Sequence, residues 1–181
     1  HDIYYSMMTF SDQLSFGNFT SKFRTWREVL EHTTSGIRTG HTVYMGSGSS
    51  SIMLRVYDKQ LEYNSKHEDR IDYKWVRWEL ELKDERADLA AAHVVSGIPV
   101  AGVAVGVLSN YLRMIVKDDS NKSRCSSQDA CKAFINHAEK LRLYIKREPD
   151  SLQDKEDWIL RQVAPTLTAL IISKYGDISF L

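Results

Sequence analysis

Two segments of the chain, 54–59 and 76–82, alternate polar and apolar residues at the two-residue period of a β-strand. Their polar side chains are Arg55, Tyr57, Lys59, Arg77, Glu79 and Glu81. If the two strands lie in one sheet, these side chains share a face on which a nucleophile, cations and potential metal ligands meet. The pKa of a free phenol is about 10, so a nucleophilic tyrosine at neutral pH needs a cation or a base beside it.

Two carboxylates one residue apart on a strand can share a hard divalent cation, which prefers oxygen ligands. Glu79 and Glu81 have this spacing, and a cation there would neutralise a phosphodiester during its displacement. Arg55 or Arg77 would add an electrostatic clamp on the non-bridging oxygens. A cross-strand ion-pair ladder between Arg55 and Glu79 or Glu81 fits the same spacing, so both interpretations stay open.

These residues need a sheet to position them. A third alternating segment, 42–45, precedes the other two, and successive strands usually pair when no helix separates them. We therefore predict an antiparallel meander with an exposed loop at 63–72. The other predicted elements are helices at 7–14, 83–96, 99–116, 128–139 and 151–175, the last bent at Pro165, and a strand at 141–146. The predicted fold class is α+β, an antiparallel sheet that carries the tyrosine and packs against several helices.

Upstream of the meander, residues 19–29 have a strand-like pattern with Lys22, Arg24 and Trp26 on one side. Basic groups interleaved with an aromatic ring can follow a phosphate backbone while a base stacks on the ring. A solvated edge strand explains the same pattern, because lysine on an edge discourages aggregation.

The segment 46–51, Gly-Ser-Gly-Ser-Ser-Ser, joins the first two strands of the meander. Ser47 and Ser49 can offer hydroxyl groups to a phosphate, but the Walker order is absent, and a flexible hairpin connection explains the segment equally well. The sequence also contains no His-x-His pair, no Gly-x-Ser-x-Gly elbow and no Rossmann fingerprint.

Composition bounds the possible classes of function. The chain has 181 residues and equal numbers of acidic and basic residues, 24 each, which argues against a binder held to nucleic acid by bulk charge. Cys125 and Cys131 match neither a Cys-x-x-Cys metal pair nor a disulfide framework, so we expect free thiols and a cytoplasmic protein. The most apolar segment, 94–116, is broken by glycine and proline and reads as a core helix, so no membrane partner is expected.

Taken together, several segments resemble one family. Residues 42–47, 54–59 and 75–83, with Tyr57 on one strand and Arg-x-Glu-x-Glu on the next, are similar to the rolling-circle replication initiation factors, the Rep-trans relaxases of Gram-positive plasmids and integrative conjugative elements. The basic aromatic stretch 21–27 resembles a strand of that family. Further downstream, the segments that resemble the conjugative-element branch are 108–113, 119–123, 139–143 and 158–167.

The resemblance implies an enzyme that nicks and rejoins DNA at a replication origin. The residue that matches the family's tyrosine, Tyr57, would attack a phosphodiester and keep the 5′ phosphate as a phosphotyrosine ester. The catalytic assignment is Tyr57, Arg55, Arg77 and Lys59, and the metal assignment is Glu79 and Glu81. The DNA-binding assignment is Lys22, Arg24, Trp26, Arg27, Ser47 and Ser49. Implied partners are Mg²⁺ or Mn²⁺, single-stranded or cruciform origin DNA, a second copy of the chain and a host helicase.

The chain departs from the family pattern in two places. The family's upstream strand with an Arg-x-Asp pattern, which helps to hold the metal, would lie before His1, and Gly48 stands where an arginine is usual. We therefore expect residues 1–181 to be one Rep-trans catalytic-type domain, truncated at its N-terminus. The alternatives are a non-catalytic DNA-binding or dimerisation fragment of such a protein, and an unrelated α+β interaction module.

Overall fold

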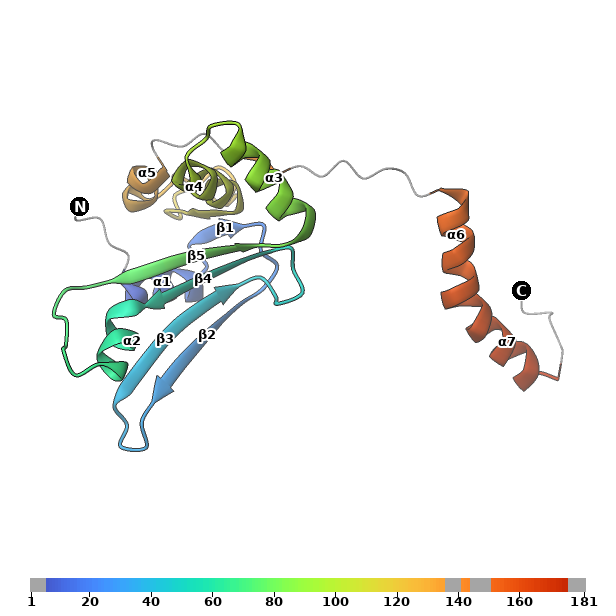
Figure 1. Cartoon of the computed structure of the whole chain (residues 1–181), viewed down its shortest axis with the longest axis horizontal. Coiled ribbons are helices and arrows are strands. Elements are labelled where there is room, and N and C mark those ends of the chain that lie inside the picture. Colours follow the sequence, from blue (N-terminus) through green and yellow to red (C-terminus); the bar gives the residue numbers. More distant parts are fainter. Residues whose placement is uncertain (1–5, 136–140, 144–150, 176–181) are drawn as a thin grey trace. The chain divides into compact units, whose positions relative to one another are not determined.

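The computed structural model of the chain describes residues 6–135, 141–143 and 151–175. Its internal contacts divide the chain into two compact units, residues 1–145 and 146–181, so the single domain predicted over 1–181 stays a prediction. The first unit holds two sheets and five helices among the described residues (Figure 1). The predicted α+β class is confirmed.

The larger sheet is an antiparallel meander of four strands. Its order is β2 (Trp26–His32), β3 (Arg38–Met45), β4 (Ile52–Asp58) and β5 (Val76–Leu82). The alternation at 42–45, 54–59 and 76–82 correctly predicted three of these strands and their order. Buried Val43, Leu54 and Val56 lie on the face that covers the core, as the two-residue period requires.

The single strand predicted over 19–29 is wrong. Residues Phe19–Ser21 form β1, which pairs with β6 (Leu112–Met114) in a separate two-stranded sheet. The chain then turns at 22–25, because the Lys22 amide donates to the Tyr111 carbonyl and the Thr25 carbonyl accepts from the Gly46 amide. These bonds fix the backbone before β2 begins at Trp26. Strand β6 itself was predicted as the end of a helix, and the only local signal is the short alternation of buried Leu112 and Met114 with Arg113.

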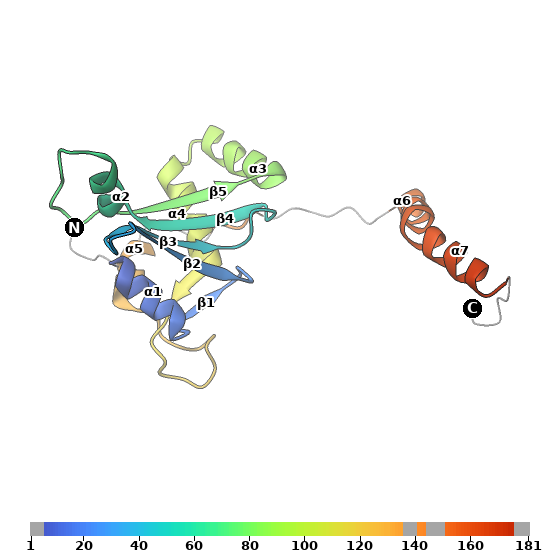
Figure 2. The same cartoon turned by 90° about the horizontal axis from the view of Figure 1, so that it is seen from below.

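One apolar cluster fills the space under the larger sheet. Helix α1 (Met7–Ser15), helix α4 (Val100–Tyr111) and helix α5 (Asp129–Ile135) contribute to it, and Phe10 of α1 is fully buried with its ring edge-on to Trp78 at 4.9 Å between centroids. Figure 1 shows α4 and α5 grouped with α3 (Asp84–Val95) beyond β5, and Figure 2 shows α1 from below the sheet. The helices predicted at 83–96 and 99–116 thus exist, the second ending at Tyr111.

Helix α2 (Lys59–Lys66) replaces part of the loop that the sequence predicted at 63–72. Asp58 caps it, since its carboxylate accepts from the Leu61 amide at 2.8 Å. The predicted strand at 141–146 is not formed in its described part, 141–143, and its remainder lies outside the described residues, as do residues 136–140 of the predicted helix at 128–139.

The second unit contains a helical segment that the sequence predicted as one bent helix. It consists of α6 (Leu152–Trp158), a π-helical turn η1 (Ile159–Val163) and α7 (Ala164–Ser173). Ser151 and Asp154 form a capping box at its start. The π turn lies directly before Pro165, whose missing amide hydrogen interrupts the regular bonding of the helix. No described helix is both long and apolar enough to cross a membrane.

Candidate active site

The polar face of the larger sheet brings the predicted catalytic side chains together. In the pairing of β4 with β5, Arg55 lies opposite Glu79 and Tyr57 lies opposite Arg77. Directly opposite residues of antiparallel strands are close enough for their side chains to interact. The register therefore places a phenol, two guanidinium groups and a carboxylate in one two-by-two patch.

The Tyr57 hydroxyl makes two hydrogen bonds within this patch. It donates to Glu79 Oε1 at 3.0 Å and accepts from Arg77 Nη1 at 3.3 Å. The phenol proton thus points at a carboxylate, while a positive charge faces the oxygen lone pair. This is the arrangement that converts a weak nucleophile into a stronger one, a base on the proton and a cation beside the oxygen.

Glu79 is shared between the tyrosine and the arginines. Arg55 Nε donates to Glu79 Oε2 at 2.9 Å, its Nη2 contacts the same oxygen, and Arg77 Nη1 lies 3.7 Å from Oε1. Partial burial would raise the pKa of Glu79, but the hydrogen bonds from Arg55 and Tyr57 outweigh burial and lower it. The cross-strand ion pair that the sequence offered as an alternative is therefore present and includes the carboxylate that accepts from Tyr57.

The sequence predicted Lys59 at the end of the strand, but Lys59 is the first residue of helix α2. Its Nζ still lies 5.9 Å from the centroid of the Tyr57 ring, and it forms an ion pair with Glu62. Trp75, to which the sequence assigned no role, stacks against Lys59 at 5.9 Å and against Arg77 at 5.4 Å. Cation–π contacts of this kind hold both cations beside the tyrosine. The position of Trp75 directly before β5 is the only sequence signal for this role.

The two predicted metal ligands, Glu79 and Glu81, are both paired with cationic side chains, and a metal site at them stays a prediction. Glu81 faces the same side as Glu79 but pairs with Lys83, whose Nζ lies 3.1 Å from Oε1. Each carboxylate therefore already has a cationic partner. The described part of the chain contains no group of three or more His, Cys, Asp or Glu side chains placed to hold one metal ion.

The residues predicted to bind DNA separate into three places. Arg27 lies on the polar face of β2, with its guanidinium 4.6 Å from the centre of the Tyr44 ring. Trp26 points to the opposite face and packs against the core, so its ring is not on the side predicted. The others lie at the far end of the sheet, in segment 22–25 and in the β3–β4 turn, and they are Lys22, Arg24, Ser47 and Ser49.

Comparisons with known proteins identify the family and the fold of this chain. The family described as Rep_trans, "Replication initiation factor", matches residues 2–179. A protein of Bacillus subtilis (strain 168) named "Putative DNA relaxase NicK" is 28% identical over 141 residues, which cover 76% of this chain and 40% of that protein. The solved structure of a rolling circle replication initiator protein from Geobacillus stearothermophilus is 26% identical, with a TM-score of 0.66, over 77% of this chain and 52% of that one.

The chain thus spans about 40% of the curated relative and about half of the solved one. The match of nearly the whole chain to one family, the similar fold of a rolling-circle initiator and the tyrosine sheet described above lead to the same assignment. This chain belongs to the Rep_trans family of replication initiation factors.

Proposed function

We propose that the chain nicks and rejoins DNA at a replication origin, with Tyr57 as the nucleophile. The Tyr57 Oη forms a bond to phosphorus while the bond from phosphorus to the 3′ oxygen breaks. The phenol proton passes to Glu79, and the 3′ oxygen leaves as a hydroxyl with a proton from solvent. The 5′ phosphate stays on the tyrosine as an ester, so the reverse attack by a 3′ hydroxyl can rejoin the strand.

The observation that carries this proposal is the pair of hydrogen bonds on the Tyr57 hydroxyl, one to Glu79 and one from Arg77. The pKa values of a phenol and a carboxyl group ordinarily differ by about 6 units, so complete transfer of the proton before attack would cost about 8 kcal/mol. Transfer during the attack avoids most of this cost. Arg77 then faces the charge that develops on the reacting oxygens.

The second candidate function is DNA binding without catalysis. It is favoured by the ion pairs of Arg55 with Glu79 and of Lys83 with Glu81, which occupy both predicted metal ligands with cationic side chains. A dependence on Mg²⁺ or Mn²⁺, homodimer formation and a host helicase partner are predictions from the family resemblance and are part of this proposal.

Replacement of the nucleophile tests the proposal. We expect the chain, mixed with Mn²⁺ and single-stranded oligonucleotides tiled across the origin of its native element, to gain the mass of a DNA fragment that digestion maps to Tyr57. Tyr57→Phe should abolish this adduct. Tyr44→Phe is the matched control, because Tyr44 lies opposite Arg55 on the same face of the sheet.

Two results would contradict the proposal. An adduct that persists in Tyr57→Phe would assign the nucleophile to another residue. Binding of the oligonucleotides without any adduct, in this chain and in a longer chain extended upstream of His1, would favour the second candidate function.

A further inference from the structure

A cavity of about 400 Å³ lies at the end of the larger sheet that is remote from Tyr57. Its walls come from segment 22–25, the turn between β3 and β4, the start of α3 and the end of α4. Ile52, the first residue of β4, lines it, whereas Tyr57 is near the end of the same strand. The cavity is therefore separate from the tyrosine patch but is built on the same strand.

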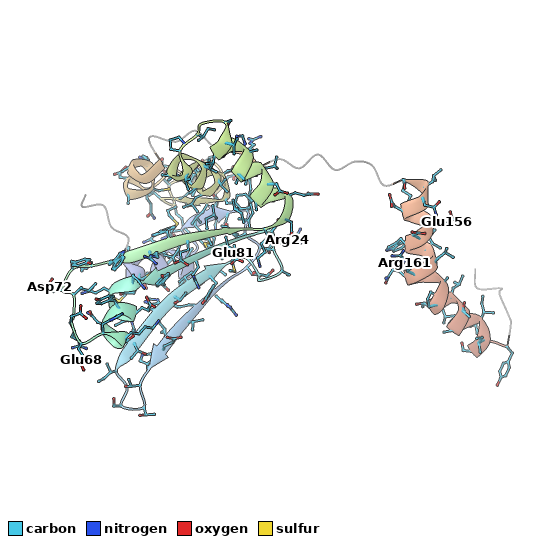
Figure 3. All side chains as sticks on the ribbon, viewed as in Figure 1. Arg24, Glu68, Asp72, Glu81, Glu156 and Arg161 are labelled. Atoms are coloured by element: carbon cyan, nitrogen blue, oxygen red, sulfur yellow. The ribbon has the colours of Figure 1, made fainter. Side chains whose placement is uncertain are left out.

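Among the described residues, the lining of this cavity carries Lys22, Arg24 and Arg86 and no carboxylate. Arg86 is held in place, because its Nε donates to Ser51 Oγ at 3.2 Å and its Nη1 donates to the Leu143 carbonyl. Arg24 is exposed, and its guanidinium has no ion-pair or hydrogen-bond partner among the described residues; Figure 3 shows it at the end of the sheet below α3. A concave surface lined by positively charged side chains favours an anionic ligand.

Serine hydroxyls form a second part of the lining. Ser47 Oγ lies 2.9 Å from Ser50 Oγ and 3.0 Å from Ser49 Oγ, and the Ser50 amide closes the turn on the Ser47 carbonyl at 2.9 Å. Ser47 and Ser50 line the cavity. Ser50 Oγ also accepts from the Ser47 amide at 3.3 Å, and an exposed hydroxyl in such a turn can still rotate its proton toward a phosphate oxygen. The turn thus offers rotatable donors beside fixed cations.

An aromatic wall completes the cavity. The rings of Phe23 and Tyr111 lie 5.2 Å apart at 48°, and both are partly exposed. Gly46 makes room for Phe23, since its φ is +90° and an added Cβ would lie 3.3 Å from Phe23 Cδ1 and 3.1 Å from the Ile52 carbonyl. Aromatic faces stack on any base, and cations with hydroxyls bind phosphate. A nucleotide has both a base and a phosphate, so it fits both parts of the lining.

We propose that this cavity binds one nucleotide of the DNA strand that Tyr57 attacks, with its base against Phe23 and its phosphate at Arg24 and Ser47. The inference rests on the proposed function and extends it to a second contact on the same strand. From Ile52 to Tyr57, β4 advances about 17 Å, the length of about five stacked nucleotides. Arg55 lies between Ile52 and Tyr57 along β4, on the polar face of the strand.

The test measures binding in the Tyr57→Phe background, so that covalent capture does not distort the affinity. The probe is a fluorescein-labelled single-stranded origin oligonucleotide, carrying an abasic site at one position at a time. We expect one position, several nucleotides from the nick site, at which the abasic site weakens binding about tenfold. Phe23→Leu keeps apolar contact with the core but removes the ring, so it should remove the penalty at that position alone.

The salt dependence of binding tests the proposed contact between Arg24 and the phosphate. Arg24→Ala should weaken binding of every oligonucleotide and lower the slope of log affinity against log salt by about 0.7, the value for one contact with single-stranded DNA. Arg124→Ala, an exposed arginine outside the cavity, should leave the slope unchanged. Both variants are on the surface, and thermal unfolding checks that they fold.

The proposal is overturned if no abasic position loses its penalty in Phe23→Leu, or if Arg24→Ala and Arg124→Ala have the same salt slope. These outcomes are independent of the nicking assay. If Phe23→Leu removes the penalty of one abasic position but no adduct forms at Tyr57, the nucleotide site stands and the assignment of Tyr57 as nucleophile is wrong. If an adduct forms at Tyr57 but no abasic position depends on Phe23, the nucleophile stands and the nucleotide site is wrong.

Discussion

At the scale of single residues, the sequence predicted Glu79 as a metal ligand or as an ion-pair partner of Arg55, and the hydrogen bond from Tyr57 adds the role of a base. As a base it must accept the Tyr57 proton, and as a metal ligand it must offer at least one oxygen to a cation. Our proposal gives Glu79 the role of the base, and two contacts support it, because Glu79 Oε1 accepts from Tyr57 and Oε2 accepts from Arg55. Because these bonds outweigh burial and lower the pKa of Glu79, the carboxylate stays ionised at and below the ordinary carboxyl pKa.

We predict that Glu79→Gln slows formation of the tyrosine adduct about 100-fold at neutral pH, the size expected for loss of a general base. The deficit should shrink as pH rises, because hydroxide increasingly replaces the missing base. Glu81→Gln, on the same face but paired with Lys83, should change the rate little. Single-turnover rates across a range of pH measure the effect.

A titration with Mn²⁺ distinguishes the role of Glu79 as a general base from a role as a metal ligand. If Glu79→Gln raises the Mn²⁺ concentration needed for half-maximal rate, and if its deficit is the same at every pH, Glu79 acts as a metal ligand rather than as the base. The same titration of Glu81→Gln decides whether Glu81 contributes to metal binding.

At the scale of elements, helix α2 connects the tyrosine strand to its partner β5. Glu62 accepts from Lys66 at 2.5 Å and pairs with Lys59, and each pair spans about one turn of the helix. The hydrogen bond from Lys59, followed by that from Lys66, lowers the pKa of Glu62 to about 2. The helix therefore holds the Lys59 cation near Tyr57 through its own surface charges.

Glu62→Gln should lower the free energy of unfolding by about 1 kcal/mol at pH 7, the usual sum for two partly exposed helix pairs. The folded pKa is below the unfolded one, so this stability is present in full above the unfolded pKa of 4.5 and is lost as pH falls toward about 2. Urea denaturation of both proteins should show the difference narrowing below pH 4.5.

Glu68→Gln is the matched control for this measurement. Glu68 lies in the loop after α2 (Figure 3) and has no ion-pair partner in the described part of the chain. Its replacement should change stability little at either pH. An equal loss in both variants would mean that the net charge of the region, rather than the Lys59 and Lys66 pairs, sets the effect.

At the scale of the whole molecule, the two compact units divide the chain at residue 145. Both apolar clusters, the tyrosine patch and the proposed nucleotide cavity consist of residues from the first unit. A unit with its own core can fold by itself. The second unit, as described, contributes exposed apolar side chains such as Trp158, Leu160 and Ile172.

We predict that a chain ending at Ile145 keeps the adduct at Tyr57 and retains the free energy of unfolding of the full chain to within about 1 kcal/mol. Denaturant unfolding and the intact-mass assay measure the two properties. Loss of cooperative unfolding in the shortened chain would show that residues 146–181 are needed for the core, and loss of the adduct alone would give them a role in DNA binding.

The sequence by itself determined which side chains share the polar face, because the side chains of a strand alternate and Leu54 and Val56 must be buried. It also determined three strands of the meander, the α+β class and the helices α3 and α4. Tertiary structure decided the rest. The register of β4 and β5, which sets Tyr57 opposite Arg77, depends on how the strands pack, and the turn at 22–25 depends on hydrogen bonds to the distant Tyr111 and Gly46. The cavity is lined by segments that are far apart in the sequence, and no local sequence pattern predicts that they lie close together in the fold.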